Sequence, residues 1–600
     1  SILKLRTMKS ITSRIILLQA LVSLSLFCYA QETVTIKILE TSDVHGAIFP
    51  YDFIGNKPME SSMAQVYTYV KKERENSQQQ VILLDNGDIL QGQPTVYYSN
   101  YIDSSSCNIV SRVFSYMGYD AATVGNHDIE TGPLVYRKVE RELAIPWMAA
   151  NAINTITGKP AFKPYTIIKR SGLKVAILGL ITPGIPSWLP RNLWPNMRFD
   201  DMVESATYWV QQIQEKEKPD VLVGLFHSGY NSSYGGANAE TPLNENASLL
   251  VARKVPGFDV IFIGHDHDKL ITKVENVQGD SVLVLDPTSS ARYISEATIQ
   301  LSLDKKKRVV SKNITGTLVE TRRFSPDSAF MAEFKSCYQK VDSFVNQPLG
   351  EFTQTISSAN AYFGPTAFMD FIHSAQLSIT NAGISFAAPL SFVSTINKGI
   401  VRVSDMFKLY RFENFLYTMN LTGAEVDAYM EYSASLWFNT MKDANDHLLR
   451  FRQNADGSMA TDNRGKVELA SRYYNFDSAA GIVYTVDVSK PDGNKVTILS
   501  MVNGEPFDTA KTYRVAINSY RGNGGGGHLT KGCGLSAEDI QKRIVASTDK
   551  DLRFYIMKFI EQQKVITPKS FGTWKIIPEE WAASGAARDH KLLFSYTGND

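Results

Sequence analysis

The chain has 600 residues, of which 44% are hydrophobic and 20% are charged. This composition is typical of a folded globular protein and excludes a disordered or collagen-like chain. The formal net charge is +1, and it falls to −3 when the four basic residues of positions 1–30 are left out. A chain so close to neutrality gives no electrostatic reason to expect binding to long nucleic acids.

Positions 1–30 have the pattern of a secretory signal peptide. Lys9 and Arg14 precede an apolar run from 15 to 27, and Ala30 follows shortly after it. A basic start, a short apolar core and a small residue at the cleavage point predict export, with Met8 as the start of translation. The run is shorter than the about 20 residues of a membrane helix. We therefore expect a periplasmic or secreted protein without stable membrane insertion, and a lipoprotein anchored at Cys28 is the alternative.

Residues 31–324 are predicted to form a first domain. Apolar segments of strand length alternate there with amphipathic stretches, and several of the segments are apolar throughout, as in strands that are buried on both faces. This alternation indicates a layered α/β architecture. The predicted strands are Thr33–Leu39, Val81–Leu84, Ala121–Val124, Val175–Leu180, Val221–Phe226 and Val260–Ile263.

The rest of the chain divides into three parts. A polar stretch at 325–349 is predicted to be a linker helix. Apolar segments and Gly-rich turns start again at 350 and continue to 580, which indicates a second domain. The last residues, 581–600, are polar, and we expect them to form a loose tail.

Polar residues that suit metal binding follow the strands of the first domain. All five histidines of the first 300 residues lie just after a predicted strand, together with carboxylates and one amide. The carboxyl edge of such a sheet is where α/β proteins bind ligands, so separate loops would deliver these side chains to one place. Each motif alone is a weak signal, and their conjunction is specific. The residues are Asp43, His45, Asp88, Asn126, His127, Asp128, His227, His265 and His267.

These residue types suit two divalent ions about 3.5–4 Å apart, which share a bridging carboxylate. Asp88 is the natural bridge. Nitrogen and oxygen ligands accept Zn²⁺, Mn²⁺, Fe or Co²⁺ alike, so the sequence leaves the metal open. We expect one site to be completed by Asp43, His45 and His267, and the other by Asn126, His227 and His265.

The predicted chemistry is phosphoester hydrolysis. Water held between two such ions has a strongly lowered pKa and becomes a hydroxide nucleophile, and the ions stabilise the charge on phosphoryl oxygens. His127 carries no metal in this assignment and could donate a proton to the leaving oxygen. We expect Asp128 to fix the ring and tautomer of His127, which makes these two the predicted catalytic residues.

The motifs resemble those of the calcineurin-like metallophosphoesterases and, more narrowly, of the bacterial 5′-nucleotidase family. The blocks that carry this resemblance are 41–46, 86–92, 125–128, His227 and 264–267. The resemblance extends from about residue 34 to 580. It implies an α/β fold with α+β elements, in which a four-layer di-metal domain is joined by a linker helix to a C-terminal nucleotide-binding domain. Substrate would be cleaved between the domains, which rotate during turnover.

Segments of the second domain favour one branch of this family. The 5′-nucleotidase branch has an Asn-Gly-Gly-x-Arg-like segment whose arginines reach phosphate, whereas 385–392 contains neither Asn-Gly nor arginine. The segments 473–477 and 518–527 resemble the 2′,3′-cyclic-nucleotide 2′-phosphodiesterase/3′-nucleotidase branch, in which two tyrosines sandwich the base. Tyr474 and Tyr520 match those positions. Stacking between two rings tolerates any base, so it does not predict a base preference.

The sequence therefore predicts a secreted di-metal enzyme that scavenges nucleotides. It would hydrolyse 2′,3′-cyclic nucleotides to 3′-nucleotides, and these to nucleoside and phosphate. One alternative is a 5′-nucleotidase or nucleotide-sugar hydrolase, and another is a non-catalytic secreted binding protein on the same fold. The oligomeric state stays open.

Overall fold

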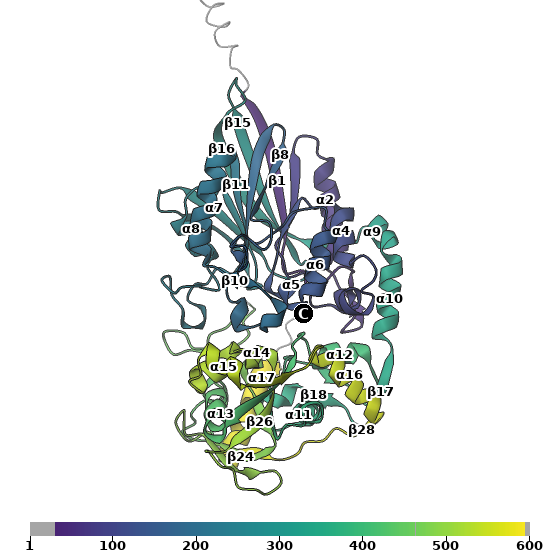
Figure 1. The fold of residues 1–600 in the computed structure, drawn as a ribbon, viewed down its shortest axis with the longest axis vertical. Coiled ribbons are helices and arrows are strands. Elements are labelled where there is room, and N and C mark those ends of the chain that lie inside the picture. Colours follow the sequence, from purple (N-terminus) through teal and green to yellow (C-terminus); the bar gives the residue numbers. More distant parts are fainter. Residues whose placement is uncertain (1–30, 463, 595–600) are drawn as a thin grey trace, which may run out of the picture.

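The structure is a computed structural model that describes residues 31–462 and 464–594. The predicted signal peptide and Cys28 lie outside these ranges. Figure 1 shows two domains, joined at one side by the helices α9 (Ser328–Glu333) and α10 (Lys335–Val345). Most of the predicted linker is thus helical, with a break at Phe334. Within the described ranges, each helix is too short or too polar to cross a lipid bilayer.

The first domain contains two six-stranded sheets. One has the order β16 (Val309–Glu320), β15 (Tyr293–Leu303), β1 (Glu32–Thr41), β4 (Gln80–Asp85), β5 (Ala121–Thr123) and β6 (Trp147–Met148). The other has the order β13 (Lys269–Glu275), β14 (Ser281–Pro287), β12 (Val260–Ile263), β11 (Val221–His227), β9 (Leu173–Ile181) and β8 (Tyr165–Arg170). All six predicted strands are confirmed, but they belong to two sheets, three in each.

Alternate residues of these strands enter different layers, which explains why the strands are apolar on both faces. In β4, Ile82 and Leu84 pack between the two sheets, whereas Leu83 packs against the outer helices. The same alternation along the other central strands gives a four-layer α/β/β/α arrangement (Figure 1), as predicted. The covering helices are α2 (Met63–Glu75), α4 (Ile109–Met117) and α6 (Pro133–Glu142) on the first sheet, and α7 (Met202–Lys216) and α8 (Ser248–Lys254) on the second.

Hydrogen bonds join the two sheets near the carboxyl ends of their parallel strands. Strands β1, β4 and β5 run parallel in the first sheet, as do β9, β11 and β12 in the second. The Asn86 amide donates to the carbonyl of Phe226 (2.8 Å), and the Thr123 hydroxyl donates to that of Leu225 (3.1 Å). The loops that follow these strands therefore converge, although they come from different sheets.

The second domain is built around a five-stranded sheet. Helices α11 (Ala367–Thr380) and α13 (Gly423–Trp437) pack against this sheet, and α12 (Val403–Leu409) packs against α16 (Leu552–Gln563). The five strands are, in spatial order, β23 (Ser478–Ala480), β19 (Ile384–Ala387), β26 (Thr512–Asn518), β22 (Leu416–Thr422) and β27 (Ile544–Ser547). Two three-stranded sheets flank it, formed by β25 (Val496–Met501), β24 (Ile482–Asp487) and β29 (Trp574–Ile577), and by β21 (Gly399–Arg402), β17 (Pro348–Phe352) and β28 (Val565–Ile566).

The prediction of a loose tail from residue 581 is wrong as far as Phe594. Helix α17 (Glu579–Phe594) covers this segment, and its Asp589 is fully buried. The Asp589 carboxylate accepts the backbone N–H groups of Leu448 and Leu449 at 2.7 and 2.9 Å. The helix thus depends on contacts with a distant segment, which a short polar sequence does not reveal.

Candidate metal centre and substrate site

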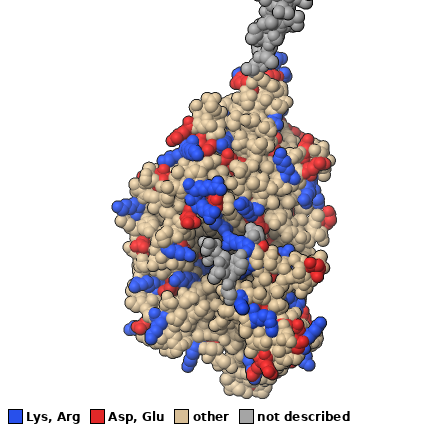
Figure 2. All heavy atoms as spheres, turned by 180° about the vertical axis from the view of Figure 1, so that it is seen from behind, with Lys and Arg blue, Asp and Glu red and all other residues tan. Residues whose placement is uncertain are grey.

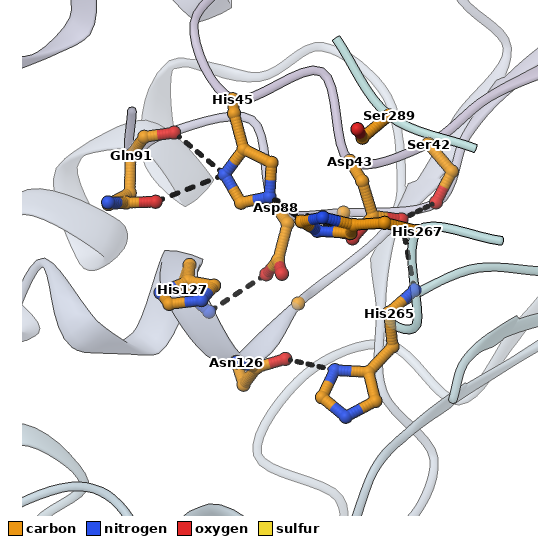
Figure 3. Close-up of polar contacts among 12 residues, drawn as sticks. Ser42, Asp43, His45, Asp88, Gln91, Asn126, His127, His265, His267 and Ser289 are labelled. Carbon is orange, nitrogen blue, oxygen red and sulfur yellow. Dashed lines mark hydrogen bonds and ion pairs between the residues drawn. The ribbon is translucent and has the colours of Figure 1, made fainter. Parts of the chain in front are cut away.

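The seven predicted metal ligands meet at the joined edge of the two sheets, and all of them except His227 are labelled in Figure 3. Asp43, His45 and His267 form one group that could hold an ion, and a second group consists of Asp88, His227 and His265. Within each group the ligand atoms lie within 4.8 Å of one another. The side-chain oxygen of Asn126 lies 3.0 Å from His227 Nε2 and 2.9 Å from His265 Nδ1, which places Asn126 in the second group. The structure thus brings together the same sets of side chains, with Asp88 in the second group, and their role as metal ligands stays a prediction.

Two buried carboxylate oxygens indicate that these residues fit cations. Asp43 Oδ1 and Asp88 Oδ2 are inaccessible to solvent and have no hydrogen-bond partner among the described residues. Leaving such oxygens unpaired is costly unless a positive charge compensates for the lost water. His267 Nε2 lies 3.4 Å from Asp43 Oδ1, and His227 Nε2 lies 3.1 Å from Asp88 Oδ2. Each oxygen therefore faces imidazole nitrogens, which is the donor set of a divalent transition-metal site.

The loops that carry the ligands adopt an unusual backbone conformation. Five of the seven predicted ligands have a positive φ, which is uncommon for residues other than glycine. Such conformations cost about 1–3 kcal/mol each and occur mainly at functional sites. The positive φ angles of these loops are therefore part of the arrangement that brings the ligand side chains together. The five residues are Asp43 (51°), His45 (48°), Asp88 (57°), His265 (80°) and His267 (60°).

Two glycines of the motifs allow the loops to approach each other closely. A Cβ atom at Gly125 would lie 2.1 Å from Asp88 Oδ1, and one at Gly264 would lie 2.1 Å from Ser42 Oγ. Real Cβ atoms do not come so close to other heavy atoms. A larger residue in front of Asn126 or His265 would therefore displace the ligands beside it.

Hydrogen bonds outside the ligand groups orient the imidazole rings. His45 Nδ1 lies 3.0 Å from both the backbone and the side-chain oxygen of Gln91 (Figure 3), so this nitrogen donates and Nε2 faces the metal position. His227 Nδ1 lies 2.6 Å from the carbonyl oxygen of Asn86, which leaves its Nε2 for the second group. Gln91 belongs to the recognised motif block, but the sequence does not show this orienting role.

The electrostatic environment favours the metal-binding protonation states of several ligands but not of His227. Burial opposes the protonation of His227, but Asp88 and Asp43 raise its pKa to about 10, so a bound cation must displace that proton. Burial raises the pKa of Asp43, but the nearby His227 and His267 outweigh burial and lower this pKa to about 2. The pKa of Asp88 is held well below its usual value by the same kind of balance, with His227 as the largest opposing charge. Burial lowers the pKa of His265 to about 3, and the charge of His227 adds to this effect. At neutral pH the two carboxylates are ionised and His265 is neutral, as ligation requires.

His127 lies next to the second ligand group but is oriented by a different residue than predicted. Its Nδ1 contacts Glu130 Oε2 at 2.5 Å, one turn along helix α5 (Asn126–Glu130). Burial opposes protonation, but Glu130 and Asp88 raise the pKa of His127 to about 10. The imidazole can therefore carry the proton that a general acid needs. The i, i+3 spacing of His127 and Glu130 was the available signal in the sequence.

The predicted role of Asp128 is wrong. Asp128 is the third residue of helix α5, where a carboxylate turns back toward the preceding loop and caps it. It therefore has no free oxygen for His127, and it holds together the two loops that carry Asp88 and Asn126. The Asp128 carboxylate accepts the backbone N–H groups of Asp88, Ile89, Leu90 and Gly125 at 2.9, 3.1, 3.1 and 2.7 Å.

Tyr474 and Tyr520, the predicted base-binding residues, are neighbours in the second domain. Their ring centroids lie 6.4 Å apart, with the planes at 83°. This edge-to-face geometry differs from a parallel sandwich, so one ring must turn for a base to stack between them. Phe412 connects the pair to the metal centre, because its ring centroid lies 6.4 Å from those of both Tyr474 and His127.

One buried arginine fixes both tyrosine segments. Arg521 pairs with both carboxylate oxygens of Asp477, at 2.8 and 3.1 Å. The same guanidinium donates to the carbonyl oxygens of Tyr474 (2.8 Å) and Gly525 (2.9 Å). Because Arg521 directly follows Tyr520 in the chain and bonds the backbone of Tyr474, it fixes the backbone from which both rings extend. Nothing in the residue pattern alone distinguishes Arg521 or Asp477 from their neighbours.

Positive charge gathers where the two domains meet. On the face shown in Figure 2, Lys and Arg side chains cluster around the middle of the molecule. Arg292 of the first domain donates to the hydroxyls of Thr288 (2.7 Å) and Ser289 (3.1 Å), and Ser289 lies beside Asp43 in Figure 3. Burial, together with the charge of Arg464 from the second domain, lowers the pKa of Arg292. A concentration of cationic groups near the ligands attracts anionic substrates.

Comparison with known families matches both domains. Residues 36–269 match the calcineurin-like phosphoesterase family, and residues 345–531 match the 5′-nucleotidase C-terminal domain. The chain joins a calcineurin-like phosphoesterase domain to a 5′-nucleotidase C-terminal domain. The predicted family and the predicted two-domain fold are therefore confirmed.

Relatives of this phosphoesterase have known names and structures. The trifunctional nucleotide phosphoesterase protein of Bacillus subtilis is 26% identical over 92% of this chain, which spans only 39% of the Bacillus protein. The 2′,3′-cyclic-nucleotide 2′-phosphodiesterase/3′-nucleotidase of Yersinia enterocolitica is 25% identical over 93% of this chain and 91% of its own length. A solved structure from Staphylococcus aureus matches with a TM-score of 0.73 and 21% identity, over 90% of this chain and 99% of that one. The 5′-nucleotidase precursor of Thermus thermophilus matches with a TM-score of 0.60 and 21% identity, over 91% and 100%. These structural matches support the fold.

Proposed function

We propose that this phosphoesterase hydrolyses 2′,3′-cyclic nucleotides to 3′-nucleotides and then hydrolyses these to nucleoside and phosphate. The observation that carries the proposal is the pair Tyr474 and Tyr520, which Phe412 links to His127 next to the metal-ligand groups. Two adjacent half-buried rings suit the stacking of a base of any kind. The named activity of the Yersinia relative supports the same substrate class.

The metal ligands and His127 have different roles in the two hydrolysis steps. When bound, two divalent ions would supply a hydroxide nucleophile and stabilise charge on the phosphoryl oxygens. His127, held by Glu130, donates a proton to the departing oxygen. In the first step the bond between phosphorus and O2′ breaks, and in the second step the bond between phosphorus and O3′ breaks. The same acid can serve both steps because each releases an alkoxide of the ribose.

A 5′-nucleotidase is the second candidate, because residues 345–531 match the 5′-nucleotidase C-terminal domain. A substrate panel separates the two. The protein is treated with chelator, reloaded with Mn²⁺ or Zn²⁺, and assayed with 2′,3′-cyclic AMP, 3′-AMP and 5′-AMP. We expect the highest kcat/KM with the first two substrates. A clear preference for 5′-AMP would support the second candidate, and metal-loaded protein without turnover would support a binding protein.

We further propose that the protein is exported and serves nucleotide scavenging, on the pattern of Lys9, Arg14 and the apolar run 15–27. Expression of the full chain in a Gram-negative host, followed by osmotic shock and mass spectrometry of the released N-terminus, tests this point. A mature N-terminus at Gln31 is expected. An intact leader on protein retained in the cytosol would contradict export.

A further inference from the structure

The ring of His265 lacks the hydrogen bond that orients two other histidines of the metal centre. His45 and His227 each bond through Nδ1 to an oxygen outside the ligand groups, and their Nε2 atoms face the metal positions. His265 is turned the other way, because its Nδ1 lies 2.9 Å from Asn126 Oδ1 (Figure 3). Its Nε2 has no hydrogen-bond partner in the part of the chain that the structure describes. Another contact must therefore hold this ring.

That contact is the indole of Trp188, which stacks on the imidazole of His265. The two ring centroids lie 5.5 Å apart, and the planes are inclined by 27°. This offset-stacked arrangement is one of the favourable geometries for a pair of aromatic rings. The indole is partly buried and packs against the core of the first domain. The stack thus fixes the plane of the imidazole, as the hydrogen bonds do for the other two rings.

The segment that carries Trp188 is itself tied to the second ligand group. Directly after strand β9, the backbone N–H of Thr182 donates to the carbonyl oxygen of His227 at 2.8 Å. The short helix η2 (Ile185–Ser187) follows, and its Ile185 is fully buried. The backbone N–H of Trp188 donates to the carbonyl oxygen of Ile185 at 3.0 Å. The indole is therefore placed relative to the ligands by hydrogen bonds and by core packing.

We propose that Trp188 is a positioning residue of the second ligand group. Its indole keeps the ring of His265 in the plane in which Nδ1 faces the cation. An imidazole that binds a divalent ion becomes electron-poor, and the electron-rich face of an indole attracts positive charge. The stack therefore stabilises the metal-bound form more than the metal-free form. The inference rests on the two-ion assignment of the ligand groups and holds whichever phosphoester is the substrate.

The test measures metal binding and not turnover. Metal-free protein is titrated with Co²⁺ in competition with a chelator, and the bound ions are counted by mass spectrometry of metals after dialysis. For Trp188→Ala we expect one of the two ions to bind about 10- to 100-fold more weakly, the usual effect of losing a residue that orients a ligand. The affinity for the other ion should stay unchanged, because among the described rings the indole stacks on His265 and on no ligand of the first group.

Three further variants complete the design. Trp188→Phe keeps a flat ring and should retain both ions. Trp188→Leu keeps apolar bulk without a flat ring, so it should weaken the same ion, and it takes the place of the alanine variant if that variant does not fold. Trp194→Ala is the matched control, because Trp194 is a partly buried tryptophan of the same segment that packs on Phe199, with the ring centroids 6.1 Å apart. It should lower the melting temperature and leave both ions bound.

The fluorescence of Trp188 gives a second readout, which a purely structural role would not change. Bound Co²⁺ quenches the emission of a nearby indole, so titration should quench the unmodified protein more than Trp188→Phe. The difference between these two proteins should follow the binding of the ion whose affinity falls in Trp188→Ala. Equal quenching in both proteins would place the indole away from the ion and overturn the inference.

The binding data are equally decisive. Selective weakening of one ion in Trp188→Ala, restored in Trp188→Phe, supports the inference. Full affinity for both ions in Trp188→Ala and Trp188→Leu, or the same weakening in Trp194→Ala, would overturn it. If the unmodified protein binds fewer than two ions, the two-ion assignment fails and this inference fails with it. The substrate panel described above tests the proposed nucleotide activity separately.

Discussion

Exchanging two neighbouring acids, one at a time, for their amides tests how His127 is oriented. Glu130→Gln keeps the size of the side chain but removes its negative charge, so His127 Nδ1 donates to a neutral amide oxygen instead of a carboxylate. A hydrogen bond to a charged group contributes about 1.5–3 kcal/mol, against about 0.5–1.5 for a neutral one. The difference of about 1–2 kcal/mol predicts a kcat about 5- to 30-fold lower. Metal content should stay unchanged.

The same substitution should change the pH profile in a known direction. Glu130 raises the pKa of His127, so its loss lowers that pKa. A general acid works while it is protonated, and activity falls as the pH rises through its pKa. The basic limb of kcat should therefore move to lower pH in Glu130→Gln. Cations bound near Asp88 lower the His127 pKa in both proteins, so the comparison between them keeps its sign.

Asp128→Asn should weaken metal binding and leave kcat near normal, the reverse of the pattern expected for Glu130→Gln. Each carboxylate oxygen of Asp128 accepts two backbone N–H groups, and an amide offers only one oxygen. Each unsatisfied donor costs about 1–3 kcal/mol, and the donors belong to the loops of Asp88 and Asn126. We expect weaker metal binding, measured by mass spectrometry of metals after dialysis, and kcat near normal with excess metal. This assignment would be refuted if Glu130→Gln kept a normal kcat while Asp128→Asn kept its full metal content and had a low kcat.

Substitutions at four other positions test the rest of the site. Asp88→Ala should abolish both metal binding and turnover more severely than any other ligand change, because a bridging carboxylate serves two ions; two ions retained with near-full activity would contradict the bridge. Tyr474→Ala or Tyr520→Ala should raise KM for purine and pyrimidine nucleotides about 5- to 150-fold, because about 1–3 kcal/mol of stacking free energy is lost. A phenylalanine at either position keeps the ring and should leave KM nearly unchanged in the same assay. Arg521→Lys should destabilise the second domain by about 3–5 kcal/mol, because it breaks a buried two-point pair with Asp477, and an unchanged melting temperature would argue against that pair.

The sequence predicted the metal-ligand groups because their arrangement follows from a general rule. Residues that follow parallel strands lie at one edge, and this holds even though β1 and β4 belong to one sheet and β11 and β12 to the other. That division itself was hidden, since strands buried on both faces look alike in a one-sheet and a two-sheet domain. The edges meet because the side chains of Asn86 and Thr123 bond across the sheets.

The features that could not be predicted from the sequence depend on the direction in which individual side chains point. Asp128 and Glu130 are both acids near His127, and only the helix geometry of α5 decides which one faces the ring. Arg521 acquires its role from Asp477, which lies far away in the chain. Helix α17 forms where a polar sequence meets a distant partner for Asp589. Such choices are made by tertiary packing, which local propensity does not encode.

The positive φ angles of the metal ligands set a limit on how this protein can be made more robust. At His45, His265 and His267 glycine would relieve the backbone cost and so favour the metal-free fold while it removes a ligand, whereas Asp43 and Asp88 also accept the backbone N–H groups of His265 and His127. Selection for heat resistance of metal-free protein would therefore enrich inactive sequences. Any search for stabilised variants must be carried out with the cations present, so that the measured stability includes both the loss of metal binding and the relief of backbone strain.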